Sequence, residues 1–416
     1  MRILLIAYYY PPLNTGGTAR PEKMAKYLQR FGHKVTVLTH SYTTTDLKNP
    51  DVIRIKDISY NKNRKGFRAL IWLGLRLYSE LLTRRGRYHS IYHWWRKRVI
   101  KNSHQAISTV KPDVIIATYP PVETLEIGIH FSQMYGIPLV CDFRDGILFE
   151  PIERSRMETF PCVRRRYVEI EREAVVTSRA VITIADPITD YFKRTYCKRA
   201  VTIAKGFDPD DFQDVPVPAV FDPSKFHIVF TGRFGLADGS NRVEFFFEAI
   251  RQMIQKERDL QNRIRVHLVG DFLKSDLMPI KDLMDMGVVI CHGLVSHAES
   301  IGFQQIADLL LIITLPDRTC SVSTKIFEYI CSKKPILALT HATVLREIIK
   351  KTQTGWIVHP HDPEAIAQLL YRIISDSEFY NSREPNLNAI DTYSIIFQIE
   401  KLVSVLNDVK GRYKNE

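Results

Sequence analysis

The C-terminal half of the sequence contains a small, polar segment that leads into a predicted helix. Residues 321–325 end in Ser323, Thr324 and Lys325, and the helix is predicted to start near Ser323. Backbone N–H groups at the start of a helix bind anions such as phosphate. Glu328 lies one turn further on, and a carboxylate can accept two hydrogen bonds from a diol. The alternative for Glu328 is a surface acid that caps the helix start. The loop and the helix start together predict a site for a phosphate group.

Further candidates follow predicted strands in the same half. Arg233 comes directly after the strand 226–230, and Arg242 lies a few residues further on. Leu294 follows the strand 288–291, in a turn that begins at Gly293. The alternative for Arg233 is a surface loop charge.

Candidates in the N-terminal half also follow predicted strands. Gly16 and Gly17 come after the first strand, where residues without a Cβ let the backbone approach a diphosphate or an acceptor closely. Asp142 and Asp145 come after the strand 138–141, and Asp145 can orient or deprotonate an acceptor hydroxyl. The alternatives are a plain turn for the glycines and a simple ion pair between Asp142 and Arg144.

The elements that position these residues alternate between strands and helices. The alternation runs from residue 3 to about residue 204, pauses at a Pro-containing stretch up to residue 223, and then restarts. This pattern predicts an α/β protein with two Rossmann-like domains that face a central cleft. The expected domains are residues 1–206 and 207–389, with residues 390–416 forming a tail helix that packs back on the first domain.

The composition is that of a folded chain without cofactor signatures. Of 416 residues, 45% are hydrophobic and 25% are charged, as in ordinary globular proteins. The six cysteines form no Cys-x-x-Cys pair, which fits a reducing cytosol. No Asp-x-Asp motif stands at a predicted strand end, so we expect no required metal and no other cofactor. No apolar run is long enough for a transmembrane helix.

The positive charge of the chain is concentrated in one segment. Residues 54–101 carry 14 Lys and Arg against two acids, which equals the whole formal net charge of +12. Within residues 62–104 the cations alternate with Leu, Trp and Tyr. This pattern favours one or two amphipathic helices lying on an anionic membrane. The alternatives are a helix on the N-terminal sheet with a solvated basic face, or nucleic-acid binding, which no recognised module supports.

Motifs spread along nearly the whole chain resemble family 4 of the retaining, nucleotide-sugar-dependent glycosyltransferases, which have the GT-B fold. They follow one another in the family's order and spacing. The segments that carry the resemblance are 10–12 with Gly16, Gly17 and Arg20, then 32–37, 112–114, 142–145, 205–208 and 231–233, and finally 325–330 followed by 333–337.

The resemblance implies roles for several of these residues. Glu328 would bind the ribose, Arg233 the diphosphate, and the turn at Leu294 the base. The sequence departs from the family at two positions. Cys320 stands eight residues before Glu328, where the family commonly has a second acid. Asn241 and Arg242 stand where it has Lys-Gly, so Arg242 would replace the missing cation.

The expected function is transfer of a sugar from a nucleoside diphosphate sugar to a glycan or lipid-linked acceptor, with retention, in cell-surface polysaccharide biosynthesis. The expected place is the cytoplasmic side of the cell membrane, as a peripheral protein. Two alternatives remain at this stage. One is a non-hydrolysing sugar-nucleotide epimerase, which shares the double-Rossmann layout. The other is a catalytically silent partner subunit, suggested by Cys320.

Overall fold

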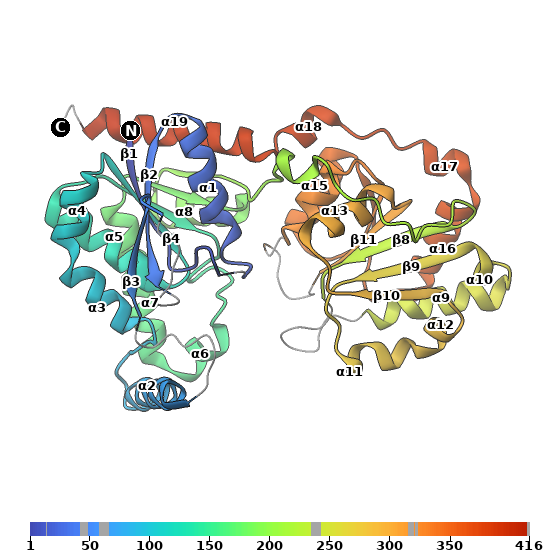
Figure 1. Cartoon of the computed structure of the whole chain (residues 1–416), viewed down its shortest axis with the longest axis horizontal. Coiled ribbons are helices and arrows are strands. Elements are labelled where there is room, and N and C mark those ends of the chain that lie inside the picture. The colour runs from blue at the N-terminus through green and yellow to red at the C-terminus, as the bar shows by residue number, and fades with distance from the viewer. Residues whose placement is uncertain are drawn as a thin grey trace. The chain divides into compact units, whose positions relative to one another are not determined.

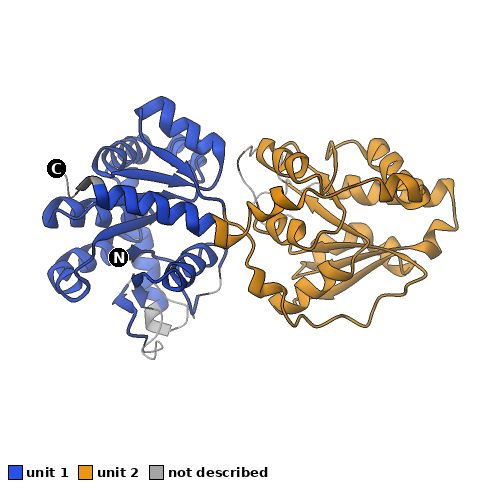
Figure 2. Ribbon diagram, turned by 90° about the horizontal axis from the view of Figure 1, so that it is seen from above, with its two compact units in different colours: residues 1–204, 398–416 blue, residues 205–397 orange. Residues whose placement is uncertain are grey.

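The computed structural model describes residues 1–13, 15–41, 49–57, 66–233, 243–314, 320 and 323–413. The chain forms two compact units (Figure 2). Unit 1 comprises Met1–Ala204 and Gln398–Glu416, and unit 2 comprises Lys205–Phe397. The first unit therefore ends after Ala204 rather than after residue 206, and the tail joins it from Gln398 rather than from residue 390.

The position of this boundary has a local cause. The backbone N–H of Phe207 donates to the carbonyl of Tyr393 at 3.0 Å, and the N–H of Ile395 donates to the carbonyl of Phe207 at 2.7 Å. This pairing ties the start of the tail to the segment that follows Ala204. Residues 390–397 therefore belong to unit 2.

Unit 1 is built on a seven-stranded parallel sheet with the order β3-β2-β1-β4-β5-β6-β7 (Figure 1). Its strands are β1 (Arg2–Ile6), β2 (Lys34–Ser41), β3 (Val52–Lys56), β4 (Val114–Tyr119), β5 (Leu139–Phe143), β6 (Ala180–Thr183) and β7 (Ala200–Thr202). The central strands β1 and β4 are almost wholly apolar and buried. A parallel strand that is covered on both faces needs such a continuous apolar run.

The edge strand β3 was not expected from the sequence. Its residues, Val-Ile-Arg-Ile-Lys, alternate between apolar and basic, and most of them are only half-buried. It pairs with β2 over five residues, from Val37 with Val52 to Ser41 with Lys56. An edge strand buries one side only, so its pattern is weaker than that of the central strands. In the sequence, its Arg54 and Lys56 were instead counted with the basic segment 54–101.

Helices cover both faces of this sheet, with α1 on one side and α3 and α5 on the other (Figure 1). The helices of unit 1 are α1 (Ala19–Arg30), α2 (Gly66–Arg84), α3 (His93–Lys101), α4 (Ser103–Val110), α5 (Val122–Tyr135), α6 (Arg154–Thr159), α7 (Pro161–Thr177), α8 (Asp186–Tyr196) and most of α19 (Ile395–Tyr413). The predicted tail helix is thus α19. Its Lys401 donates to the carbonyl of Thr202, and its Asp408 pairs with Arg199 at 2.5 Å.

Unit 2 is built on a six-stranded parallel sheet with the order β10-β9-β8-β11-β12-β13. The strands are β8 (Phe226–Thr231), β9 (Ile264–Val269), β10 (Val289–Gly293), β11 (Leu309–Ile313), β12 (Ile336–Leu339) and β13 (Gly355–Val358). The helices on its faces are α9 (Glu244–Lys256), α10 (Leu260–Arg263), α11 (Lys274–Leu277), α12 (Lys281–Asp285), α13 (His297–Ile306), α14 (Lys325–Cys331), α15 (Thr343–Thr352), α16 (Pro363–Ser375), α17 (Ser377–Asn381) and α18 (Leu387–Asp391). Short 3-10 turns occupy Pro209–Phe212 and Met278–Ile280.

Both sheets are parallel throughout, so the predicted fold class of two Rossmann-like α/β units is confirmed. In such sheets ligands bind outside the carboxyl ends of the strands. Most of the described candidate residues follow the ends of β1, β5, β8 and β10 or lie at the start of α14, whereas Asp142 is part of β5 itself, which runs to Phe143.

Candidate active site

Three adjacent strands of unit 2 end where the backbone segments pack tightly together. A Cβ atom on Gly270, after β9, would lie 1.9 Å from the carbonyl oxygen of Gly232, after β8. Gly232 also has a φ of 107°, a conformation that residues with a side chain rarely adopt. The N–H of Gly232 donates to the carbonyl of Val269, and the N–H of Gly270 donates to that of Gly293. Glycine is therefore required at these two strand ends.

Helix α14 is fixed to the end of β8 by a buried tyrosine. The N–H of Thr231 donates to the Tyr329 hydroxyl at 3.0 Å, and the Thr231 hydroxyl lies 3.1 Å from the same oxygen. Burial raises the pKa of Tyr329 to about 12. The hydroxyl is thus a neutral anchor, and it places the first turn of α14 at the end of β8.

Lys325, the first residue of α14, brings its ammonium group to Gly232. A Cβ atom on Gly232 would lie 2.1 Å from Lys325 Nζ. The same nitrogen lies 4.6 Å from the centre of the Phe230 ring, within reach of a cation–π interaction. Burial lowers the pKa of Lys325 to about 8, although the charge of Glu328 acts in the opposite direction. Within the described part of the chain, no carboxylate forms an ion pair with Lys325, and an anionic ligand would satisfy it.

Glu328 is held by two side chains of α13. Gln304 Nε2 donates to Glu328 Oε2 at 3.2 Å, and His297 Nε2 donates to Oε1 at 3.0 Å. The Glu328 side chain remains 15% exposed. It contacts α13 and forms no described bond with the start of its own helix, where Thr324 makes no side-chain cap. Each carboxylate oxygen keeps a lone pair for a ligand hydroxyl.

Arg233 is oriented by the loop after β9. Its Nε donates to the carbonyl of Asp271 at 2.8 Å, and its second terminal nitrogen pairs with Asp271 Oδ2 at 2.9 Å. A guanidinium has five N–H groups, so further donors remain for a ligand. Arg242 lies outside the described residues.

The remaining candidate residues of unit 2 are Leu294, Ser323 and Cys320. Leu294 is 81% exposed, directly after β10. The Ser323 hydroxyl lies 3.4 Å from the N–H of Lys325, which donates to it. Cys320, at the position of the family's second acid, is buried. The structure thus brings Lys325, Glu328 and Arg233 to the β8 end of unit 2.

In unit 1, the two adjacent glycines differ. A Cβ atom on Gly17 would lie 3.2 Å from both Arg144 and the Tyr9 ring, whereas nothing lies within 4 Å of a Cβ on Gly16. Arg144 also donates a short hydrogen bond to the carbonyl of Gly17. Gly17 therefore packs against Arg144 and Tyr9 of the same unit, and the approach of these two glycines to a diphosphate or an acceptor stays a prediction.

The suggested pairing of Asp142 with Arg144 is wrong. Asp142 is fully buried and pairs with Arg20 at 2.8 Å, while the Thr118 hydroxyl donates to its other oxygen at 2.8 Å. Arg144 donates to the backbone carbonyls of Tyr119, Pro120 and Gly17. Asp142 thus forms a structural ion pair that joins β5 to α1, because Arg20 of α1 packs against this buried carboxylate.

Asp145 follows this pair at the carboxyl end of β5 and is half-buried. Burial, together with the charge of Asp145, raises the pKa of Tyr119 above the ordinary value for tyrosine. Asp145 therefore lies near the end of β4, the strand next to β5 in the sheet. This is the edge at which an acceptor hydroxyl is expected.

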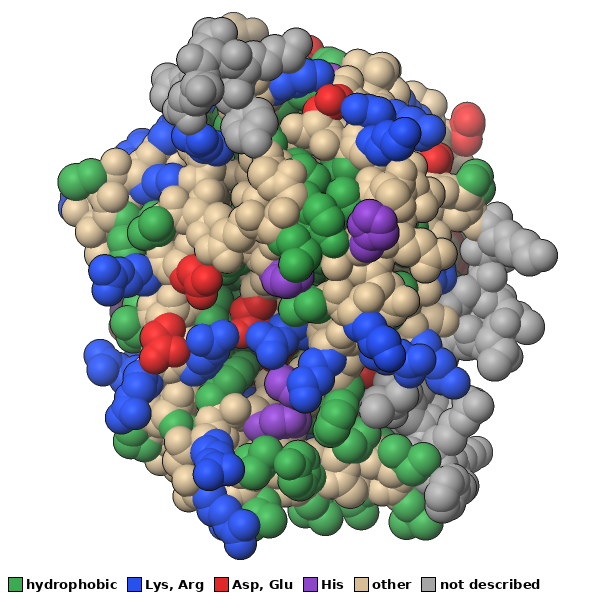
Figure 3. Space-filling view, turned by 90° about the vertical axis from the view of Figure 1, so that its left-hand side faces the viewer, with side chains coloured by type: hydrophobic (Ala, Val, Ile, Leu, Met, Phe, Trp, Pro, Cys, Tyr) green, Lys and Arg blue, Asp and Glu red, His purple; other side chains and the backbone are tan. Residues whose placement is uncertain are grey.

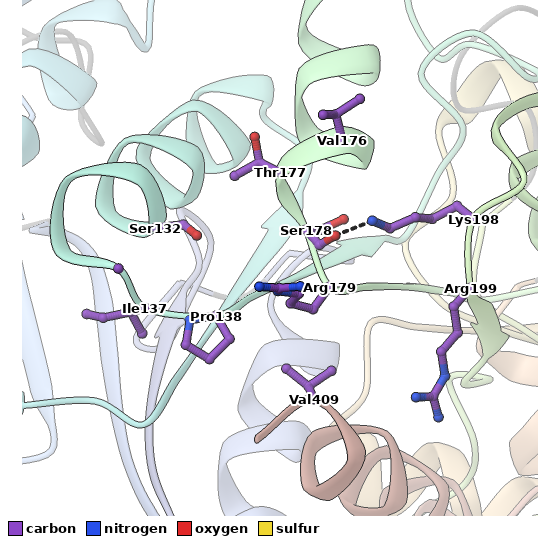
Figure 4. A pocket seen from close by; sticks show the side chains of 11 residues that line it. Ser132, Ile137, Pro138, Val176, Thr177, Ser178, Arg179, Lys198, Arg199 and Val409 are labelled. Carbon is purple, nitrogen blue, oxygen red and sulfur yellow. Dashed lines mark hydrogen bonds between the residues drawn. The ribbon is translucent and has the colours of Figure 1, made fainter. Parts of the chain in front are cut away.

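Two cavities among the described residues of unit 1 lie at opposite ends of its strands. One, of about 470 Å³, lies before β5, β6 and β7. Figure 4 shows that its Lys198 is turned toward Ser178, to whose carbonyl it donates. The other, of about 580 Å³, lies at the carboxyl ends of β1 and β4 and contains Tyr9, Tyr119 and Glu123. Sequence reasoning missed Glu123, because a single acid at a helix start carries no signal.

The described residues contain no cluster of three or more His, Cys, Asp or Glu side chains arranged to hold a metal ion. They also contain no helix that is long and apolar enough to cross a membrane.

The two parallel α/β units have the arrangement of strands and helices of a GT-B fold, and the comparisons agree. The family described as "Glycosyl transferase 4-like domain" matches residues 15–204, and the one described as "Glycosyl transferases group 1" matches residues 225–376. One match falls in each unit. No curated protein matches the chain. The protein is a glycosyltransferase with the two-domain GT-B fold.

Solved structures share this fold at low sequence identity. Sucrose-phosphate synthase from Thermosynechococcus elongatus is 15% identical, with a TM-score of 0.66 and coverage of 98% of this chain and 99% of the other. HepE of Anabaena, in complex with UDP and glucose, is 16% identical, with a TM-score of 0.59 and the same coverage. The UDP-forming trehalose-phosphate synthase from Burkholderia xenovorans is 12% identical, with a TM-score of 0.64 and the same coverage.

Proposed function

We propose that the protein transfers a sugar from a nucleoside diphosphate sugar to a glycan or lipid-linked acceptor, with retention at the anomeric carbon, in cell-surface polysaccharide biosynthesis. The observation that carries the proposal is the pair of Lys325 and Glu328 beside the glycine-lined end of β8. A cation and a carboxylate one helical turn apart suit the diphosphate and the ribose of a nucleotide. The complex of HepE with UDP and glucose supports this choice of donor.

In this proposal Glu328 accepts hydrogen bonds from the ribose hydroxyls. His297 and Gln304 keep its carboxylate in place through the bonds that they donate. Lys325 and Arg233 bind the diphosphate, and the backbone at Leu294 borders the base. Arg242 and the residues before Ser323 would complete the phosphate contacts.

The reaction forms a bond between an acceptor oxygen and the anomeric carbon, while the bond from that carbon to the diphosphate breaks. The transition state resembles an oxocarbenium ion, as in other glycosyl transfers. Negative charge develops on the leaving diphosphate, and Lys325 and Arg233 stabilise it. Asp145 orients the acceptor hydroxyl and takes its proton. Because the chain supplies these cations, we propose that transfer needs no metal ion.

A nucleotide-release assay tests this function. The full chain is incubated with UDP-, GDP- and ADP-sugars and a set of glycan and lipid-linked acceptors. A glycosyltransferase releases the nucleoside diphosphate from one donor only when an acceptor is present. An epimerase would instead form a new sugar nucleotide, and a silent subunit would form neither product. Either of these two results would reject the proposal.

We further propose that helix α2 holds the protein on the anionic, cytoplasmic face of the cell membrane. One side of α2 exposes apolar residues at helical spacing: Leu70, Leu73, Leu77 and Leu81, of which Leu70 is 65% and Leu77 60% exposed. The segment that contains α2, residues 54–101, carries the net charge of +12. Figure 3 shows hydrophobic side chains along the lower edge of this face of the molecule, with Lys and Arg side chains near them. Apolar insertion and attraction to anionic lipid act together in such helices.

Vesicle flotation tests the membrane contact. We expect the chain to float with vesicles of phosphatidylcholine and phosphatidylglycerol and to stay behind with pure phosphatidylcholine. Each cation near an anionic surface contributes about 1 kcal/mol, so the difference should be large. Changing Leu73 and Leu77 to Ser should reduce flotation, whereas Leu387→Ser, an exposed leucine of unit 2, should not. Equal binding to both kinds of vesicle would reject an electrostatic contact.

A further inference from the structure

Six aromatic residues line the cavity at the carboxyl ends of β1 and β4. Its volume of about 580 Å³ lies within the range of ~300–1,000 Å³ that is usual for small-ligand sites. The rings that line it are Tyr9, Trp72, Tyr88, Tyr92, Tyr119 and Tyr167. They come from the ends of β1 and β4, from α2 and α7, and from the loop between α2 and α3. Such rings offer flat apolar faces together with polar hydroxyl groups.

The polar centre of this cavity is Glu123, at the start of α5. Its side chain is 2% exposed. Ser90 donates a short hydrogen bond to Glu123 Oε1, and Tyr88 donates to the same oxygen at 3.4 Å. Glu123 Oε2 is buried and has no hydrogen-bond partner among the described residues. A buried polar atom without a partner costs about 1–3 kcal/mol, and a ligand hydroxyl that reached it would recover that cost.

The charged side chains that line the cavity are Arg76, Arg156 and three acids. Two of the acids have cations: Glu153 pairs with Arg156 at 3.2 Å, and Glu80 pairs with Arg84 at 3.1 Å. Arg76 lies over the Trp72 ring. Glu123 is the lining acid without a described ion pair. Burial and the nearby charge of Glu126 raise the pKa of Glu123 well above its usual range, which favours the protonated form of its carboxyl. A protonated carboxyl can both donate to and accept from a hydroxyl.

From these observations, we propose that this cavity binds a single sugar ring of the acceptor, with Glu123 as the residue that hydrogen-bonds its hydroxyls. The aromatic walls cover the apolar faces of the ring, and Glu123 selects a hydroxyl pattern. The inference rests on the proposed glycosyl transfer, because an acceptor is what unit 1 must then bind. Tyr119 and Asp145 at the same edge place the cavity next to the residue proposed to act on the acceptor hydroxyl.

Helix α2 connects this cavity to the proposed membrane contact. Trp72, Arg76 and Ser79 line the cavity, and their spacing places them on one side of the helix. Leu73 and Leu77 lie on the other side and are exposed. One helix therefore separates a sugar-sized cavity from the surface that would meet lipid. This arrangement suits an acceptor sugar that is carried at the head of a lipid.

Saturation-transfer NMR on the full chain tests the cavity. The probes are methyl glycosides of glucose, galactose, mannose and N-acetylglucosamine, each with and without saturating UDP. We expect at least one glycoside to bind. Glu123→Gln, which keeps the size of the side chain, should weaken its binding about tenfold, and Trp72→Ala should weaken it as well. The matched control, Glu158→Gln on the exposed surface of α6, should leave it unchanged.

A second measurement separates this inference from the proposed function. Calorimetry with UDP, GDP and ADP reports on unit 2, so nucleotide binding should be the same in Glu123→Gln as in the unaltered chain. If a nucleotide binds but no glycoside does, or if both cavity variants bind the glycoside normally, the cavity is not a sugar site and the inference is overturned. If a glycoside binds but no nucleotide does, the donor assignment fails and the cavity assignment stands.

A third comparison distinguishes a lipid-linked acceptor from a free glycan. Octyl glycosides, below their micelle concentration, carry the same ring as methyl glycosides and add an alkyl chain. Tighter binding of the octyl form, lost in the variant with Leu73 and Leu77 changed to Ser, would assign the cavity to a lipid-linked acceptor. Equal binding of the two forms would assign it to a free glycan.

Discussion

Replacing Glu328 with Gln tests the ribose assignment most directly, because the structure shows how the new side chain can fit. Gln304 donates to Oε2 and His297 to Oε1. The amide of Gln can place its oxygen toward Gln304 and its NH2 group toward His297. The His297 ring can then accept this bond by moving its proton to the other nitrogen. We therefore expect the free energy of unfolding to change by less than about 1 kcal/mol.

The effect on nucleotide binding should be much larger. The variant loses the carboxylate lone pairs that would accept the ribose hydroxyls. A hydrogen bond to a charged group contributes about 1.5–3 kcal/mol. Losing one such bond raises the dissociation constant by roughly 10- to 150-fold.

Calorimetry with a ribonucleoside diphosphate and its 2′,3′-dideoxy form measures how much the ribose hydroxyls contribute to the binding free energy. The unaltered chain should prefer the ribo form, and Glu328→Gln should lose most of that preference, as in a double-mutant cycle. Glu347→Gln, an exposed acid on α15, is the control and should change neither affinity. If Glu328→Gln weakened both ligands equally, the carboxylate would not contact the diol and the reasoning would be refuted.

Three further predictions concern stability and metal dependence. Gly270→Ala should lower the free energy of unfolding by about 3 kcal/mol or more in urea titrations, because its Cβ would meet the Gly232 carbonyl at 1.9 Å. The control is Gly16→Ala, which has open space around it and should change the free energy of unfolding by less than about 0.5 kcal/mol. Equal effects of the two variants would contradict the packing. The chain should become less stable as the pH falls from about 6.5 toward 3, because burial lowers the pKa of His267 to about 3 and the unfolded chain therefore takes up more protons. In His267→Gln this pH dependence should flatten, and an unchanged slope would assign it to other groups. EDTA should leave sugar transfer unchanged, since Lys325 and Arg233 supply the positive charge; loss of transfer that Mg²⁺ or Mn²⁺ restores would show that a metal is required.

His267, on which the pH prediction depends, is the middle member of three histidines that are joined by hydrogen bonds. His227 Nε2 donates to the carbonyl of Asp222, so its Nδ1 accepts from His267 Nε2 at 2.8 Å. His267 Nδ1 must then accept from His292 Nε2 at 2.9 Å. A proton added to His267 would remove this acceptor. The chain of bonds therefore requires the neutral form.

The sequence was sufficient for the elements whose signals are local. Continuous apolar runs such as those of β1 and β4 marked strands that are buried on both faces, and helical spacing marked α1 and α14. The glycines and polar residues after these strands indicated the ligand-binding edge. The segment around Lys325 and Glu328 predicted a nucleotide site on a helix start. Weak or short patterns failed, as with the edge strand β3, whose basic residues resembled the segment that follows it.

Contacts between distant segments could not be read from the sequence. Asp142 pairs with Arg20 across 122 positions, and nothing near Asp142 distinguishes that partner from Arg144. Likewise, the cavity at Glu123 exists because α2, the loop before α3 and the ends of β1 and β4 meet in space. The sequence alone determined which residues stand at the strand ends of this glycosyltransferase. Only the tertiary structure decided which of them are held by partners and which remain for a ligand, because burial and pairing depend on what folds against each side chain.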